Sequence, residues 1–75
     1  MTRAEVLQVQ LYLRNAFGTE RITVQGRKDK DDSAEVTLAG EFVGVVFRDD
    51  EEGEVSYDFH MTILSEDLPP APHGA

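Results

Sequence analysis

Three side chains with the chemistry of a hydrolase alternate along one stretch of the sequence: Ser56, Asp58 and His60. A serine nucleophile needs its histidine base within about 3 Å. Alternation puts all three on one face of an extended strand, where Ser56 and His60 lie about 13 Å apart. A single chain with this spacing assembles no catalytic site, so we expect no enzymatic activity.

Acidic side chains form a second group with recognisable chemistry: Asp49, Asp50, Glu51 and Glu52 are consecutive. They lack the alternating ligands and the twelfth-position glutamate of a helix–loop–helix calcium loop. We interpret them as a solvated hairpin loop, and weak divalent-metal or small-ligand binding there, or at His60, as the alternative function. No phosphate-binding glycine loop or paired metal-ligand motif occurs, so no cofactor is expected.

Composition excludes several classes of protein. The 75 residues carry 7 basic and 15 acidic side chains, a formal net charge of −8, and no cysteine. Negative charge repels phosphate backbones and anionic lipid, so we expect neither nucleic-acid nor membrane binding. The longest nonpolar run, 42–47, is far shorter than the about 20 residues that span a bilayer. The first residues lead into an amphipathic segment unlike a secretory signal, which predicts a cytoplasmic protein.

A helix over Arg3–Phe17 is predicted from the residues at its two ends. Thr2 and Glu5 match a capping box, and Gly18 suits the left-handed residue that ends a helix. At about 100° per residue, the apolar side chains gather on one face. That predicted core stripe consists of Val6, Val9, Leu13, Ala16 and Phe17, with Tyr12 at its margin.

After the helix, apolar and polar side chains alternate with a period of two, which is typical of strands. Strands are predicted around 22–25, 35–38, 42–47 and 54–64, joined by short loops. The sequence therefore predicts an α+β fold in which one N-terminal helix packs on a four-stranded antiparallel meander (αββββ). Residues 1–68 would form this single domain, and the Pro-rich residues 69–75 a disordered tail.

The loop lengths predict the strand register. Turns over 28–32, 39–40 and 49–53 set Val24 opposite Val36, Val36 opposite Val43, and Val45 opposite Tyr57. The same turns set Phe47 opposite Val55 and put one apolar set, with Phe59, on the face under the helix. Because alanine is a poor residue for the positive φ of a primed turn, a bulge at Gly40 that shifts the second hairpin remains an alternative.

This register leaves apolar side chains on the outer face of the sheet and unpaired backbone at the end of the last strand. An exposed apolar cluster is typical of an interaction surface, and an unpaired strand edge can accept another chain. Leu7 and Leu11 lie on a second ridge of the predicted helix. They either widen the core stripe or contact another chain. The predicted interface residues are Phe42, Gly44, Val46, Met61, Leu64, Leu7 and Leu11.

Five stretches resemble a known family: Leu11–Arg14, Phe17–Gly18, Asp31–Val36, Phe42–Arg48 and Asp49–Tyr57. The family is small, known mainly from alphaproteobacteria, and defined only as a domain of unknown function. The resemblance covers about residues 5–68 and implies a stand-alone small cytoplasmic protein. It carries no motif of known chemistry, so no activity, ligand or site is transferred from the family.

A chain of this size without a disulfide or a metal gains stability most readily from self-association. We therefore expect a small non-enzymatic protein-interaction or homo-oligomerising module. Its partner would be a second copy or another protein.

Overall fold

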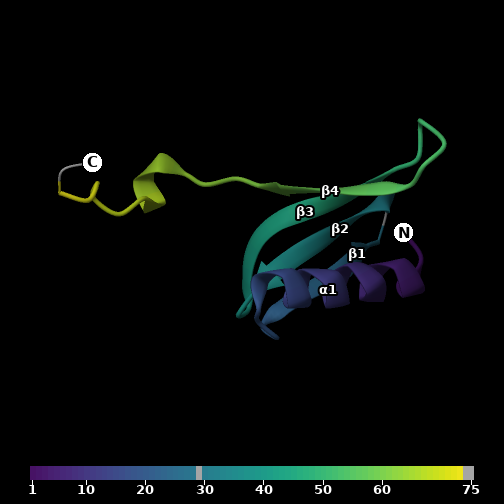
Figure 1. Cartoon of the computed structure of the whole chain (residues 1–75), viewed down its shortest axis with the longest axis horizontal. Coiled ribbons are helices and arrows are strands. Elements are labelled where there is room, and N and C mark those ends of the chain that lie inside the picture. The colour runs from purple at the N-terminus through teal and green to yellow at the C-terminus, as the bar shows by residue number, and fades with distance from the viewer. Residues whose placement is uncertain (29, 74–75) are drawn as a thin grey trace.

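The fold is one helix followed by a four-stranded sheet and an extended C-terminal segment. The computed structural model describes residues 1–28 and 30–73. Its elements are α1 (Arg3–Phe17), β1 (Ile22–Arg27), β2 (Lys30–Leu38), β3 (Glu41–Asp49), β4 (Ser56–Met61) and the 3₁₀ turn η1 (Ser65–Asp67). The strands are antiparallel in the order β1-β2-β3-β4, and α1 lies along one face (Figure 1). The predicted αββββ meander is confirmed.

Local signals at both ends set the length of α1. The Thr2 hydroxyl accepts a hydrogen bond from the Glu5 amide at 3.1 Å, and the Glu5 carboxylate accepts one from the Thr2 amide at 2.8 Å. At the other end Gly18 adopts the left-handed φ of 64°. The capping box and the terminating glycine thus form as predicted.

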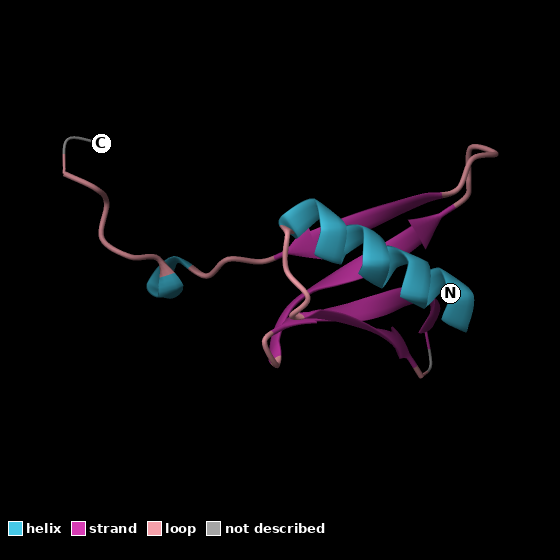
Figure 2. Ribbon diagram, turned by 60° about the horizontal axis from the view of Figure 1, so that its bottom comes forward, coloured by secondary structure: helices cyan, strands magenta, loops and turns pink. Residues whose placement is uncertain are grey.

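The hydrophobic core lies between α1 and the sheet, mainly over β1 and β2, with one residue from β3. Its buried apolar residues are Val6, Val9, Leu13, Ile22, Val24, Ala34, Val36 and Val46. Two helix side chains also bond to the outer strand: Gln10 accepts from the Val24 amide at 3.0 Å, and Arg14 donates to the Ile22 carbonyl at 2.7 Å. The helix, which crosses one face of the sheet in Figure 2, therefore caps part of the β1 edge.

The first two connections agree largely with the predicted register. Val24 lies opposite Val36, as predicted. Ala39 and Gly40 have φ values of 53° and 85°, the consecutive positive angles of a type I′ turn. The alternative of a bulge at Gly40 is not observed, because alanine accepts the left-handed conformation here.

The bulge lies in β3 instead, and it overturns the predicted faces of that strand. Phe42 pairs with Thr37, but Gly44 pairs with Val36, so Val43 is an extra residue between them. The predicted pairing of Val36 with Val43 is therefore wrong. An inserted residue turns every following side chain to the opposite face, and Val46, predicted to face solvent, is only 1% exposed beneath α1.

The β3–β4 pairing also differs from the prediction. Val46 lies opposite Phe59 and Arg48 opposite Tyr57; the predicted pairs of Val45 with Tyr57 and of Phe47 with Val55 are wrong. The observed pairing is shifted by three residues from the predicted one. An odd shift would turn the β4 side chains to the opposite face, but the bulge has already inverted β3, so the two changes cancel. Tyr57 and Phe59 consequently face the helix, as predicted.

Beyond β4 the chain leaves the sheet and extends away from the domain (Figure 1). We call residues 62–68 the C-terminal arm. The radius of gyration is 14.6 Å, against about 11 Å expected for a compact chain of this length. Residues 69–73 are exposed and belong to no helix or strand, while residues 74–75 of the predicted disordered tail lie outside the described residues.

Candidate functional site

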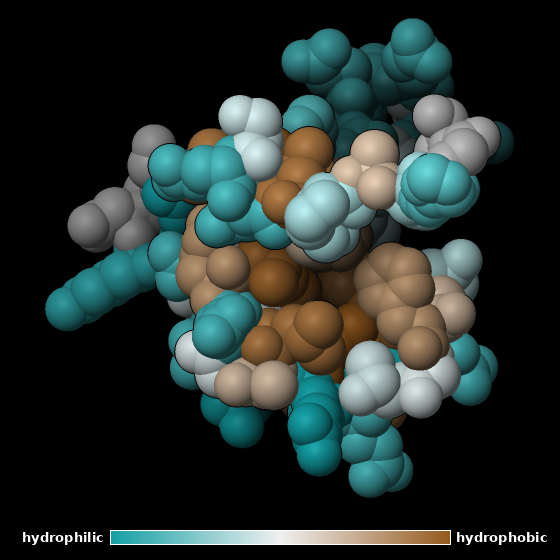
Figure 3. Space-filling model, turned by 90° about the vertical axis from the view of Figure 1, so that its left-hand side faces the viewer, coloured by the Kyte–Doolittle hydropathy of each residue, from teal (hydrophilic) through white to brown (hydrophobic). Residues whose placement is uncertain are grey.

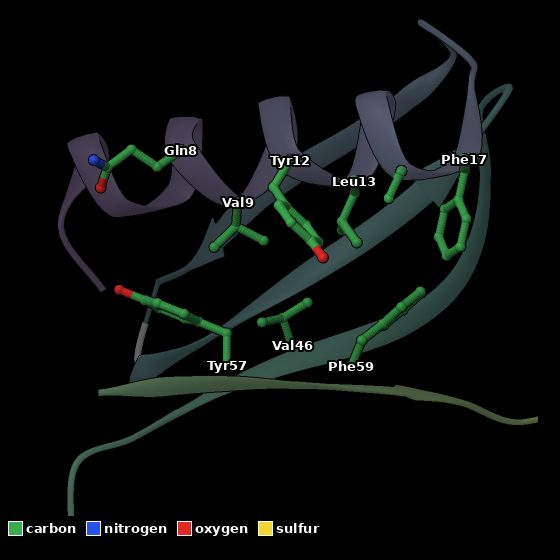
Figure 4. A pocket seen from close by; sticks show the side chains of 9 residues that line it. Gln8, Val9, Tyr12, Leu13, Phe17, Val46, Tyr57 and Phe59 are labelled. Carbon is green, nitrogen blue, oxygen red and sulfur yellow. The ribbon is translucent and has the colours of Figure 1, made fainter. Parts of the chain in front are cut away.

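A groove runs between α1 and the β3–β4 half of the sheet. Because α1 packs mainly over β1, an open space remains between its other side and the β3–β4 half of the sheet. The space between has a volume of about 740 Å³ (Figure 4). It is lined from the helix by Gln8, Val9, Tyr12, Leu13, Ala16 and Phe17, and from the sheet by Val46, Tyr57 and Phe59.

Several lining side chains were predicted to belong to the core. Ala16 is exposed and Phe17 is 58% exposed, so their assignment to a buried stripe is wrong. Tyr12, predicted at the margin of the stripe, is 72% exposed. The helical periodicity identified their common face correctly. They stay exposed because they face the open groove, of which they form the helix wall.

Gly44 and Phe59 shape the floor of the groove. A Cβ atom built on Gly44 would collide with the His60 carbonyl oxygen and lie 2.7 Å from the Phe59 ring. Glycine at this position therefore makes room for the ring. This close approach lies one residue after the bulge in β3.

An aromatic pair lies at the end of the groove where the arm leaves the domain. The Phe17 and Phe59 rings are 6.4 Å apart, inclined at 50°. Figure 3, viewed from this end, shows hydrophobic side chains gathered in the middle of the face, with hydrophilic side chains around them. This mouth of the groove is therefore apolar.

A polar cluster ties the helix to the sheet at the opposite end. The Glu5 carboxylate accepts hydrogen bonds from Arg48 Nε at 2.7 Å and from the Tyr57 hydroxyl at 2.8 Å. Arg48 also bonds to Asp50 through Nη1 at 2.9 Å. We call Glu5, Arg48 and Tyr57 the Glu5 clasp. It joins the first turn of α1 to β3 and β4.

The clasp holds its groups in fixed protonation states at neutral pH. The Thr2 amide, and then Tyr57 and Arg48, lower the pKa of Glu5 to about 2. The hydrogen bond to Glu5, with desolvation, raises the pKa of Tyr57 above its ordinary value. Neither group exchanges a proton near pH 7, so the clasp is suited to holding structure and not to acid–base catalysis.

The outer face of the sheet carries a second, smaller hollow of about 270 Å³. Phe42, 61% exposed, lines it as predicted, but the side chain of Val46 faces the groove. Phe47 and His60 are its other main members, their rings edge to face with centroids 5.2 Å apart. Val46, predicted to lie on this outer face, is buried beneath α1 instead, whereas Gly44, although buried, lines the hollow.

The remaining predicted interface residues are exposed but scattered. Leu7 and Leu11 are 45% and 65% exposed on the helix, where neither lines a described pocket. Met61 ends β4 at 54% exposure, and Leu64 lies in the arm at 51%. The structure does not bring these four side chains together with Phe42.

The residues with recognisable chemistry assemble no site in the described part of the chain. Ser56, Asp58 and His60 are exposed on β4 at alternate positions. In the acidic loop, Asp49 accepts a hydrogen bond from the Glu51 amide at 2.9 Å. No three metal-ligating side chains converge among the residues described.

The fold and the groove define a small α+β domain with an open apolar face. The chain belongs to the family described as protein of unknown function (DUF3126), whose model matches residues 5–67. No curated protein and no solved structure gives a significant match. Within the described residues, no helix is long and apolar enough to cross a membrane.

Proposed function

We propose that this chain is a small, non-enzymatic protein-interaction module that binds an apolar polypeptide segment in the groove between α1 and β4. The open apolar groove of about 740 Å³ carries this proposal. Burying a large apolar side chain contributes about 1.5–3 kcal/mol, so a small domain that leaves such a surface open forgoes stability. A contiguous exposed apolar surface of this kind is typical of an interaction site.

The shape of the groove favours a chain segment over a small molecule. Small-molecule sites enclose most of their ligand and orient it with a few polar groups. This groove is open along one side, and the Tyr57 hydroxyl is already bonded to Glu5. From Gln8 to Phe17 the helix wall is about 14 Å long at 1.5 Å per residue, which about four extended residues can follow.

The lining also indicates which segment would bind. Phe59 offers apolar surface below, and Phe17 offers it at the mouth. Two or three large apolar side chains of a bound segment would fill this space. The Tyr12 side chain at the rim presents both a ring and a hydroxyl, a combination frequent in protein interfaces.

Selection of peptides from a random display library tests the proposal. The target is the full-length chain with Ile63→Ser, Leu64→Ser and Leu68→Ser, which removes the chain's own apolar arm residues as competitors. We expect enriched peptides rich in large apolar residues that shift the NMR signals of groove residues. Failure to enrich any peptide, or shifts confined to other surfaces, would contradict the proposal.

Two substitutions in one helical turn provide the matched control. Ala16→Arg places a long charged side chain in the groove, whereas Asn15→Arg places the same side chain on an exposed neighbour outside it. Both put a cation in the last helical turn, where the helix dipole favours it. We expect Ala16→Arg to abolish peptide binding and Asn15→Arg to preserve it; equal affinities would exclude the groove as the site.

We further propose that the protein acts in the cytoplasm of alphaproteobacterial cells. The chain has no cysteine and therefore none of the disulfides typical of oxidising compartments, which supports that compartment. Fractionation of cells that express the native chain, followed by immunodetection, tests it; recovery with the periplasm or the membranes would contradict it.

A further inference from the structure

The C-terminal arm carries large apolar side chains that nothing in its own domain covers. Ile63, Leu64 and Leu68 are 63%, 51% and 58% exposed. In Figure 1 the arm runs outward from the end of β4, away from both the sheet and the helix. The same chain thus presents an apolar groove without an occupant and an apolar segment without a cover.

The direction of β4 makes it hard for the arm to enter its own groove. Tyr57 lies at the Glu5 end of the groove and Phe59 at the Phe17 end, so the chain leaves β4 at the mouth and points outward. A return would need a four-residue reversal. A turn placed directly after Met61 would include both Ile63 and Leu64, and only Leu68 would remain to reach the groove.

The arm has the length that the groove of another copy requires. Its residues 63–68 comprise three outside η1 and three within it. At about 3.3 Å per extended residue and about 2.0 Å per 3₁₀ residue they span about 16 Å. The helix wall from Gln8 to Phe17 is about 14 Å long. Beyond Leu68, Pro69 and Pro70 carry no amide hydrogen, so strand pairing cannot continue past the arm.

We propose that two copies of this chain exchange arms, so that residues 62–68 of each copy lie in the α1–β4 groove of the other. This inference rests on the proposed function, because it names the segment that the groove binds. The two contacts are identical and related by a two-fold axis, so the assembly closes as a dimer. Mutual exchange covers Ile63, Leu64 and Leu68 together with the exposed sides of Tyr12 and Phe17.

Sedimentation equilibrium of full-length variants tests the exchange. We expect the unmodified chain to reach twice its 8.4 kDa mass at high micromolar concentration. Removing three apolar contacts with Ile63→Ser, Leu64→Ser and Leu68→Ser should raise the dissociation constant at least about 100-fold. Ala16→Arg should do the same, and Asn15→Arg should change it by less than about 3-fold, the scale of an exposed substitution.

Mixing experiments separate exchange from other dimers. The arm variant keeps its groove and the Ala16→Arg variant keeps its arm, so a mixture of the two can form one of the two contacts. We expect the mixture to contain a heterodimer that neither variant forms with itself. A dimer that survives in both single variants would overturn the proposal and assign association to the β4 edge or the outer face.

Disulfide trapping identifies the contact directly, because the chain has no cysteine. Chains with Ala16→Cys and chains with Leu64→Cys are mixed and oxidised, with Asn15→Cys as the matched control. We expect a linked heterodimer with the groove position and not with the control. A double variant, Ala16→Cys with Leu64→Cys, that closes into a monomeric ring at high dilution would overturn exchange in favour of the arm binding its own groove.

The failure of this inference can be told from the failure of the proposed function. A chain that stays at 8.4 kDa and gives no link overturns the exchange. If selected peptides still bind the groove of the arm variant in that case, the groove serves another polypeptide and the proposed function stands. If those peptides also fail to bind, both proposals fall.

Discussion

The helix packs closely against one edge strand of the sheet and leaves a groove beside the other. Along β1 it packs closely, burying Ile22 and Val24 and bonding to the strand backbone through Gln10 and Arg14. Along β4 it stays apart, and the Glu5 clasp is the described polar link between them. The β1 side therefore supplies the cohesion of the fold, whereas the β4 side keeps apolar surface accessible.

This asymmetry explains why so small a domain retains an exposed groove. A helix of 15 residues about 10 Å across cannot cover four strands that are each about 4.8 Å apart. Centring the helix would have left part of each edge bare. Packing it over β1 protects one edge and concentrates the exposed apolar surface along the other, where one segment can cover it.

The largest expected effect is at the strand whose face the bulge inverts. Val46→Asp buries a charge under the helix, at a cost of about 3–5 kcal/mol for an unpaired buried ion. Total stability for 75 residues is about 4–11 kcal/mol, so we expect this substitution to remove about half of it and to lower the midpoint of denaturant unfolding, followed by circular dichroism, far below that of the unmodified chain. Val45→Asp, one residue away on the outer face, should stay folded. If Val45→Asp destabilised the fold more than Val46→Asp, Val45 would face the helix, as the register predicted from the sequence requires.

A smaller loss is expected where the Phe59 ring crosses Gly44. Gly44→Ala forces its methyl group against the His60 carbonyl and the ring, and overpacking of this kind costs about 2–3 kcal/mol. Chemical denaturation measures it. Gly26→Ala is the matched control, because its methyl group would meet only Val6 at 3.8 Å. Equal losses in the two variants would contradict the close approach at Gly44.

The contrast between the two sides can be measured by truncating one side chain on each. Val24→Ala removes buried methyl groups on the β1 side and should cost about 2 kcal/mol in unfolding free energy. Tyr12→Ala removes a larger but exposed side chain on the β4 side, and in a monomeric arm variant it should change stability by less than about 0.5 kcal/mol. A loss at Tyr12 as large as that at Val24 would mean that the groove is closed in solution.

The smallest expected effect is the pH dependence of the Glu5 clasp. Since folding lowers the pKa of Glu5 from 4.5 to about 2, its ionised form stabilises the fold at pH values above about 4.5, and this contribution disappears as the pH falls toward 2. Thermal unfolding of Glu5→Gln should show a lower midpoint than the unmodified chain at pH 7, with the difference narrowing below pH 4.5. A difference that is constant from pH 7 to pH 2 would exclude the clasp as its source. For Tyr57→Phe, the difference in unfolding midpoint from the unmodified chain should also shrink below pH 4.5, but it should be smaller at pH 7 than for Glu5→Gln.

Much of the fold was predictable from the sequence because its signals are local. Thr2, Glu5 and Gly18 determine both ends of α1 through neighbouring backbone groups, and the two-residue turn at Ala39-Gly40 sets the β2–β3 hairpin. The faces of β3 were not predictable, because residues 42–47 are apolar at odd and even positions alike. The pattern of apolar and polar residues therefore does not indicate which residue of β3 forms the bulge.

The groove and the clasp were missed for a different reason. Both depend on where the helix lies across the sheet, which is determined by packing between distant residues. Glu5 was recognised as a capping residue, but its second oxygen meets Arg48 and Tyr57, more than 40 positions away. The predicted last strand over 54–64 is too long, because β4 ends at Met61. The sequence indicates correctly only that the chain near Leu64 has no neighbouring strand.

Isotope-filtered NMR on a mixture of labelled and unlabelled full-length chains tests the exchange of arms most directly. We expect nuclear Overhauser effects between copies that connect the methyl groups of Ile63, Leu64 and Leu68 with the rings of Tyr12, Phe17 and Phe59. Inter-copy effects confined to the β4 backbone or to Phe42 and Phe47, or none at all in a monomeric sample, would contradict the placement of the arm in the groove of a second copy.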